Sequence, residues 1–209
     1  MTRIVAGEVG GRTLRVPARG TRPTSERVRE ALFSRLHHMD VLRGARVLDL
    51  YAGSGALGLE AASRGAASVA LVERSRPAAQ VIGANVRSLG LAEVASVHTA
   101  DVRSYLLSRG GEALGGDLDL VFLDPPYDID EDTLTEALEL LAPWIGADTL
   151  VVVERSTRSP EPSWPEHLHL EERRAYGETV VWFAGPPLPP DSGEGDGDHP
   201  GALPPRSPS

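Results

Sequence analysis

The sequence contains no cysteine and no lysine, and only 5% of its 209 residues are aromatic. Without cysteine, the chain has no disulfides, no thiolate zinc sites and no catalytic thiol. No apolar run reaches the roughly 20 residues that a membrane span requires, and the first residues lack the apolar core of a signal peptide. These absences predict a cytoplasmic protein with no membrane partner. All 21 basic residues are arginines, which fork phosphate and stack on bases.

The net charge of -9 conceals an asymmetry along the chain. Residues 1–46 hold ten arginines and four acidic residues, a balance of +6, whereas residues 47–209 carry a balance of -15. A basic segment on an acidic body is typical of local attraction to phosphate. A solvated surface with a chance bias is the alternative, and charge by itself leaves both open.

Short apolar runs alternate with helical patterns from residue 46 onwards. The runs predict strands at 46–50, 68–72, 95–98, 118–123 and 149–154. The stretches between them predict helices at 56–64, 76–88, 102–108 and 131–142. Such alternation implies parallel strands with right-handed crossovers. Two final strands, 169–175 and 178–184, predict an antiparallel hairpin, so we expect an α/β fold with a Rossmann-like, seven-stranded mixed sheet.

Different patterns flank this sheet. The N-terminal residues predict a small β-hairpin, 3–6 with 13–16, followed by a helix that begins at Thr24 or Ser25. After residue 185 the chain is rich in proline, glycine and acidic residues without periodicity, which predicts disorder. The expected organisation is a basic N-terminal arm at 1–40, a catalytic domain at 41–184 and a tail at 185–209.

A glycine-rich turn follows the first strand of the expected sheet. Gly53, Gly55 and Gly58 match the G-x-G-x-x-G spacing of nucleotide-binding turns. This spacing alone leaves a nicotinamide-dependent oxidoreductase open. Asp49 stands just before the turn, where its carboxylate would repel a dinucleotide pyrophosphate but suit the ammonium and sulfonium groups of S-adenosylmethionine. We therefore favour S-adenosylmethionine as the cofactor.

Two further carboxylates follow the next two strands. Glu73 ends the second strand, where it can accept hydrogen bonds from ribose hydroxyls. Asp101 follows the third strand and is placed to accept from an adenine amino group. Either acid alone could instead be a helix N-cap or a solvated residue. Together with Asp49 they lie on the edge where open α/β sheets bind ligands.

The fourth strand runs directly into Asp124, Pro125, Pro126 and Tyr127. A planar amine is a poor nucleophile because its lone pair is delocalised into the ring, and two acceptors on its N–H bonds favour the pyramidal geometry. Asp124 and the Pro125 carbonyl can supply them, and Tyr127 can stack on a base. The motif predicts methyl transfer to such an amine with Asp124 as proton acceptor and without a metal. A proline-rich turn without catalytic role is the alternative.

Taken together, these blocks resemble the RsmD family, the 16S ribosomal RNA guanine(966)-N2 methyltransferases within the class I S-adenosylmethionine-dependent methyltransferases. The glycine turn and the Asp-Pro-Pro-Tyr motif are shared by many amino methyltransferases. The segment from Thr21 to Phe33, with its arginines, is more particular to this family, and it carries the substrate assignment.

The resemblance implies a class I methyltransferase fold and, as the partner, 16S ribosomal RNA in an assembling small subunit. Nothing in the sequence requires more than a monomer, so we expect a monomer. The implied cofactor-binding residues are Asp49, Tyr51, Gly53, Ser54, Gly55, Glu73, Arg74, Asp101, Val102 and Thr24. The implied RNA-binding residues are Arg3, Arg12, Arg22, Arg27 and Arg174. Other planar amines (DNA adenine N6, another RNA guanine, protein glutamine) and a non-catalytic RNA-binding assembly factor remain alternatives.

Overall fold

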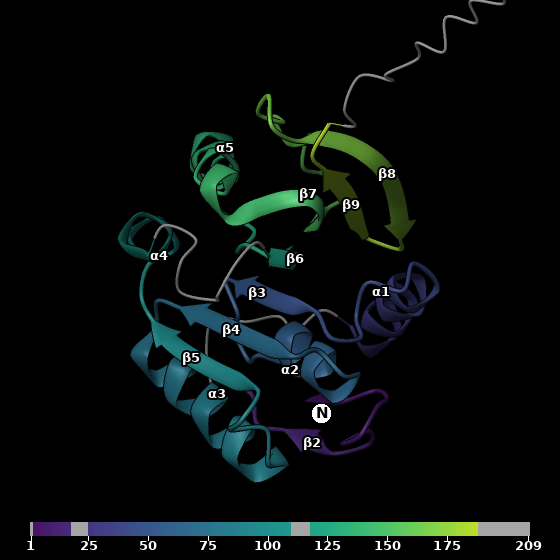
Figure 1. The fold of residues 1–209 in the computed structure, drawn as a ribbon, viewed down its shortest axis with the longest axis vertical. Coiled ribbons are helices and arrows are strands. Elements are labelled where there is room, and N and C mark those ends of the chain that lie inside the picture. The colour runs from purple at the N-terminus through teal and green to yellow at the C-terminus, as the bar shows by residue number, and fades with distance from the viewer. Residues whose placement is uncertain (1, 18–24, 110–117, 188–209) are drawn as a thin grey trace, which may run out of the picture.

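A seven-stranded sheet runs through the middle of the molecule in the order β5-β4-β3-β6-β7-β9-β8 (Figure 1). The structure is a computed structural model, and it describes residues 2–17, 25–109 and 118–187. The strands of the sheet are β3 (Arg46–Leu50), β4 (Ser68–Glu73), β5 (Ala95–Thr99), β6 (Leu118–Leu123), β7 (Ile145–Ser156), β8 (His169–Tyr176) and β9 (Thr179–Gly185). The first five are parallel, while β9 is antiparallel to both β7 and β8. The expected mixed sheet with a closing hairpin is therefore confirmed.

Helices cover both faces of this sheet. They are α1 (Glu26–His38), α2 (Ala56–Ser63), α3 (Arg76–Leu89), α4 (Val102–Arg109) and α5 (Glu131–Glu139). Side chains from α1, α2 and α3 share one buried core with alternate strand residues, and those from α4 and α5 share the other. The central strands are apolar on both faces because each face is covered.

The strand order reverses between β3 and β6. From β3 the chain moves outward through β4 and β5, and it then returns to add β6 on the other side of β3. Crossovers leave a crevice at such a switch point, outside the carboxyl ends of the strands, where open α/β sheets bind ligands. The topology thus directs attention to the residues that follow β3 and β6.

The N-terminal hairpin is shorter than the sequence pattern suggests. Strands β1 (Thr2–Arg3) and β2 (Thr13–Leu14) pair over two residues each. Helix α1 begins after Ser25, whose hydroxyl accepts a hydrogen bond from the Val28 amide, as expected of an N-cap. The expected tail lies outside the described residues from 188 onwards.

Two other boundaries also differ from expectation. Helix α5 ends at Glu139 instead of residue 142, because Pro143 follows and residues Ala142–Trp144 form a separate 3-10 helix. Strand β7 starts four residues early, at Ile145, with a register irregularity against β6. No helix in the described part of the chain is long and apolar enough to span a membrane.

Candidate active site at the carboxyl edge of the sheet

Strand register brings four candidate side chains into one row. Where the pairing among β4, β3, β6 and β7 ends, the residues opposite one another are Val72, Leu50, Leu123 and Val153. One position further along are Glu73, Tyr51, Asp124 and Glu154. Successive residues of a strand point to opposite faces, so Asp124 and Glu154 leave the sheet on the same face as the buried Phe122 and Val152. Residues that are up to about 100 positions apart in sequence thus meet at one edge.

The glycine turn between β3 and α2 is tightly constrained. Tyr51 and Gly53 both have positive φ angles, 63° and 58°. A left-handed conformation at a residue with a Cβ is costly and is concentrated at functional sites. Gly55 caps α2 in the left-handed conformation. Gly58, one turn into the helix, lies so close to β3 and β4 that an added Cβ would be 2.9 Å from Leu71 Cδ2.

Asp49 is buried beneath this turn. Its Oδ2 atom accepts a hydrogen bond from the Gly58 amide at 2.8 Å. Burial raises the pKa of Asp49 to about 7, with Asp124 and Glu73 adding to the effect and the Gly58 amide opposing it. A cationic group beside Asp49 would favour the ionised carboxylate, which fits the ligand charge expected from the sequence.

Glu73 is held at the mouth of the turn by two backbone amides. Gly53 N donates to its Oε2 at 2.9 Å and Ser75 N to its Oε1 at 2.7 Å. Each carboxylate oxygen has about two acceptor positions, so both can still receive a ribose hydroxyl. Asp101 caps the start of α4 through the Ser104 amide at 3.3 Å, and it also lines the adjoining cavity. Asp101 can therefore cap the helix and also contact a ligand in this cavity.

Two adjoining cavities flank these residues. One, of about 420 Å³, is lined by the glycine turn and the Asp-Pro-Pro-Tyr segment, and the other, of about 440 Å³, extends toward α4 and α5. They share the lining residues Tyr51, Glu73, Arg74, Pro126 and Asp128. Their chemistry fits S-adenosylmethionine, because the buried Asp49 carboxylate lies at one end, the Glu73 carboxylate in the middle and an apolar wall with Val102 and Ile129 at the other end.

Most of the expected cofactor residues line these cavities. Those present are Asp49, Tyr51, Gly53, Ser54, Glu73, Arg74, Asp101 and Val102. Gly55 does not line either cavity; its Cβ position would be 3.1 Å from Ile82 and Leu59, so its place is in the packing of the turn. Thr24 lies outside the described residues.

All four residues of the Asp-Pro-Pro-Tyr segment line the cavity of about 420 Å³. Asp124 is half-buried, Pro125 is buried, and Tyr127 has 68% of its surface exposed. The segment turns sharply, since the Ile129 amide donates to the Pro126 carbonyl at 3.1 Å. An aromatic ring so exposed beside a cavity is available for stacking on a planar ligand.

A wide groove adjoins the Asp-Pro-Pro-Tyr segment on the other side. It has a volume of about 1340 Å³ and lies between α1, the end of β7 and the β8–β9 turn. Tyr127 and Glu154 line both this groove and the cavity of about 420 Å³. Of the arginines expected to bind RNA, Arg27 lines the groove, and Arg158 joins it without having been predicted.

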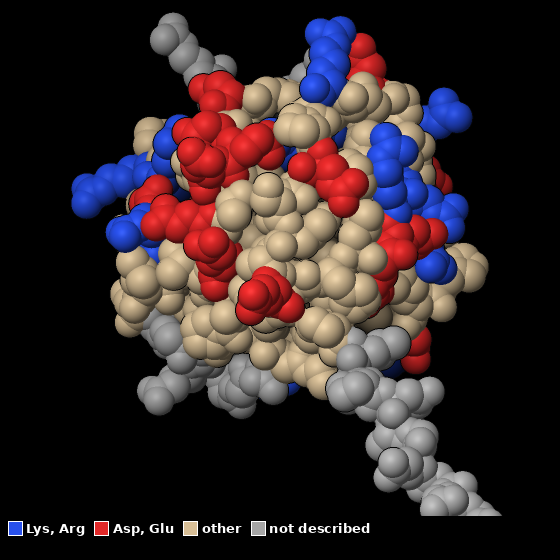
Figure 2. All heavy atoms as spheres, turned by 90° about the horizontal axis from the view of Figure 1, so that it is seen from above, with Lys and Arg blue, Asp and Glu red and all other residues tan. Residues whose placement is uncertain are grey.

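Three other arginines of residues 1–46 form ion pairs within the protein. Arg3 donates to Glu26 at 2.6 Å, Arg35 to Glu172 at 2.9 Å and Arg46 to Asp119 at 3.2 Å. On the face shown in Figure 2, acidic and basic side chains of the described residues lie interspersed. The balance of +6 over residues 1–46 therefore overstates the charge offered to a partner.

Two more of the arginines expected to bind RNA, Arg12 and Arg174, do not line the groove. Arg12 donates to the Ser88 carbonyl at 2.7 Å, and Arg174 pairs with Glu172 at 2.7 Å. Arg22 falls outside the described residues.

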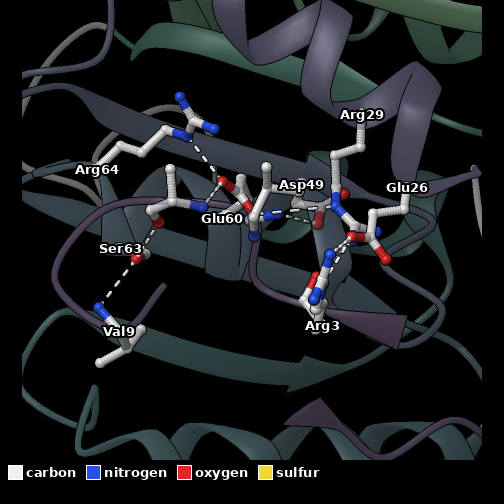
Figure 3. A network of polar contacts seen from close by, with 11 residues as sticks. Arg3, Val9, Glu26, Arg29, Asp49, Glu60, Ser63 and Arg64 are labelled. Atoms are coloured by element: carbon white, nitrogen blue, oxygen red, sulfur yellow. Dashed lines mark hydrogen bonds and ion pairs between the residues drawn. The ribbon is translucent and has the colours of Figure 1, made fainter. Parts of the chain in front are cut away.

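A buried ionic cluster joins the N-terminal segment to α2 (Figure 3). Glu60 accepts hydrogen bonds from the Val5 and Ala6 amides at 2.6 and 3.0 Å and from Arg64 at 2.7 Å. Arg29 of α1, fully buried, lies 3.9 Å from Glu60 and donates to the Arg3 carbonyl. This cluster explains how the Arg29 side chain can be buried in the protein.

Glu154 is the main site residue that the sequence reasoning missed. It is 7% exposed, ends the apolar part of β7 and lines three cavities around the Asp-Pro-Pro-Tyr segment. The rule applied to Glu73 and Asp101, an acid at the carboxyl end of a parallel strand, would have found it.

Comparison with known proteins agrees with this geometry. The family model described as conserved hypothetical protein 95 matches residues 2–185. Ribosomal RNA small subunit methyltransferase D of Escherichia coli K12 is 36% identical over 181 residues, covering 85% of this chain and 86% of the relative. The protein of the same name from Haemophilus influenzae is 35% identical over 179 residues, covering 84% of this chain and 89% of the relative.

A solved Escherichia coli structure, yhhF, provisionally described as a methyltransferase, superposes with a TM-score of 0.76 at 34% identity, covering 88% of this chain and 97% of the other. These similarities decide against the oxidoreductase that the glycine spacing left open. The chain belongs to the conserved hypothetical protein 95 family, which is the RsmD family of methyltransferases that its sequence blocks resemble.

Proposed function

We propose that this protein transfers a methyl group from S-adenosylmethionine to the exocyclic N2 amine of a guanine in small-subunit ribosomal RNA. The observation that carries the proposal is the Asp-Pro-Pro-Tyr segment at the end of β6, set between a cavity suited to S-adenosylmethionine and a wide open groove. The relatives that cover most of the chain bear the name ribosomal RNA small subunit methyltransferase D, which supports the substrate class.

The cofactor would occupy the two adjoining cavities. Glu73 would accept from the ribose hydroxyls, Asp101 from the adenine amine, and Asp49 would offset positive charge at the methionine end. When bound, S-adenosylmethionine supplies an electrophilic methyl group on a sulfonium. Gly53 and Gly58 allow the backbone and α2 to approach closely enough to form this end of the site.

The catalytic segment would bind and orient the amine. The Asp124 carboxylate and the Pro125 carbonyl would accept its two N–H bonds, which directs the nitrogen lone pair toward the cavity that Asp49 and Glu73 line. Positive charge then develops on the nitrogen, and Asp124 is the nearest proton acceptor in the proposal. Tyr127 would stack on the base, a contact worth about 1–3 kcal/mol.

The groove between α1 and the β8–β9 turn would receive the RNA around that base. Its volume of about 1340 Å³ would accommodate a strand from which one nucleotide is splayed toward Tyr127, as recognition of single-stranded RNA requires. Arg27 and Arg158 would contact phosphate there. The finer elements of the proposal are an assembling small subunit as substrate and the guanine(966) position.

The test is methylation of small subunits from an Escherichia coli strain that lacks its own methyltransferase D. Purified protein, labelled S-adenosylmethionine and these subunits should give one N2-methylguanine, identified by mass spectrometry of nuclease fragments. Label appearing only in adenine, in protein, or nowhere would contradict the proposal. Naked RNA and assembled subunits tested in parallel identify which form is the substrate.

A further inference from the structure

Glu154 lies beside Asp124 at the carboxyl edge of the sheet. Leu123 and Val153 are paired in the parallel register of β6 and β7, so the next residues, Asp124 and Glu154, occupy neighbouring positions about 5 Å apart in backbone. Both side chains leave the same face of the sheet. Two carboxylates are therefore side by side, and the proposed mechanism uses only Asp124.

Glu154 stands where the cavity and the groove meet. It lines the cavity with Asp124 and Pro125, it lines the wide groove with Arg27, and a small cavity joins it directly to Asp124, Pro125 and Tyr127. Suppose that Asp124 and Pro125 hold the amine of a base and that Tyr127 contacts its ring. The next atom along the edge of that base would then lie beside Glu154. Glu154 is the acidic residue that lines both spaces.

Glu154 interacts electrostatically with the buried Arg29. Arg29 is fully buried in α1, and the charge of Glu154 counteracts the lowering of the Arg29 pKa by burial. A carboxylate accepts hydrogen bonds and donates none. The competing explanation is that Glu154 serves only as the counter-ion of Arg29. Glu60, however, already lies 3.9 Å from Arg29.

Guanine offers donors that match two adjacent carboxylates. Its Watson–Crick edge carries the N2 amine next to an N1–H, whereas 2-aminopurine keeps the amine but has a lone pair at N1. We infer that Glu154 is a specificity-determining residue that accepts the N1–H of the target guanine while Asp124 and Pro125 hold its N2 amine. The inference rests on the proposed function, and it adds how the site selects guanine over a purine with an unprotonated N1.

The experiment compares guanine with 2-aminopurine at the mapped methylation position. Small subunits are reconstituted from ligated ribosomal RNA carrying either base, and initial rates of methyl transfer are measured at subsaturating substrate. For the unmodified enzyme we expect a preference for guanine of about 100-fold or more, because a carboxylate facing the N1 lone pair is repelled and an expected hydrogen bond is lost.

Glu154→Gln should narrow that preference by at least about tenfold, because an amide can donate to N1 of 2-aminopurine as well as accept from guanine. The change in O6 and in amine reactivity between the two bases affects both enzymes and cancels in the ratio of preferences. A residue that only neutralises Arg29 would lower both rates together and leave the ratio unchanged.

Glu178→Gln is the matched control, since Glu178 is exposed on the rim of the same groove but does not line the cavity with Asp124. It should keep the full preference for guanine. An unchanged ratio in a folded Glu154→Gln protein overturns the inference. If that variant does not fold, a preference below tenfold in the unmodified enzyme overturns it equally. Absence of guanine methylation by the unmodified enzyme would instead contradict the proposed function.

Discussion

Among single residues, Asp124 has the most direct proposed role, since it would accept one N–H of the amine and then the proton. We expect Asp124→Ala to lower the rate of methyl transfer by about 100- to 1000-fold, the usual cost of removing one such acceptor or donor. Cofactor affinity, measured by calorimetry, should change little. Asp148→Ala is the control, because Asp148 is an exposed acid near the start of β7, at the opposite edge of the sheet. Full activity of Asp124→Ala would remove this role.

Asp49 links the protonation of one buried group to stability. Its pKa is about 7 in the folded protein, compared with 3.8 for an exposed aspartate. Between pH 3.8 and pH 7 the folded state therefore holds a proton that the unfolded state has lost. The free energy of unfolding should therefore fall as pH rises from about 4 to 7, by up to about 4 kcal/mol from this group. Urea denaturation at pH 5 and pH 8 measures the change.

Asp49→Asn is the control for this pH effect, because the amide oxygen can still accept from Gly58 N but does not titrate. The variant should lack this part of the pH dependence. Binding of S-adenosylmethionine should show the opposite trend in the unmodified protein, weakening below pH 7 as Asp49 is protonated. Equal pH dependence in both proteins would contradict the assignment.

Among the elements, α2 connects the cofactor turn with the N-terminal segment. At its start, the N-cap Gly55 and Gly58 lie beside the strands of the sheet. Further along, Glu60 and Ser63 accept hydrogen bonds from backbone amides of residues 5–9. A displacement of α2 would therefore reach both the proposed cofactor site and the docking of the N-terminal hairpin.

Gly58→Ala tests this close approach. The added Cβ would lie 2.9 Å from Leu71 Cδ2 and 3.0 Å from Asp49 Oδ2, so either these buried side chains or α2 must shift. We expect a loss of about 1–3 kcal/mol in the free energy of unfolding and weaker cofactor binding.

Gly83→Ala in α3 is the matched control, because its Cβ would meet only the flexible end of Arg87 at 3.5 Å. This substitution should stabilise the helix by up to about 1 kcal/mol. Equal stability of the two variants in urea denaturation would contradict the packing argument.

At the scale of the whole molecule, the net charge of -9 requires a local explanation for RNA binding. Arg27 and Arg158 line the wide groove and are exposed. Each alanine substitution should weaken RNA binding and reduce the slope of log affinity against log salt concentration by about one. Filter binding between 50 and 200 mM salt gives this slope.

Arg43→Ala provides the comparison for the salt slope. Arg43 is exposed just before β3, at the amino end of that strand and therefore on the opposite edge from the Asp-Pro-Pro-Tyr segment. Its removal changes the net charge equally but should leave the slope unchanged. If Arg43→Ala has the same effect as Arg27→Ala, binding reflects overall charge and not the groove.

The sequence by itself determined the order and type of the elements and the three acids at strand ends. Apolar runs of strand length separated by helical patterns have few other solutions, and β3 and β6 match their expected bounds residue for residue. The turn chemistry at Gly53 and the proline pair after β6 are local, so they too could be recognised without a structure.

Only the tertiary structure decided which charges are available and which residues meet. Arg29 is buried, and Arg3, Arg35 and Arg46 are paired, because their partners come from distant segments that local periodicity does not reveal. The row that joins Asp124 with Glu154 likewise depends on strand register. Register and ion pairing are long-range properties, and the packing of the whole sheet determines them.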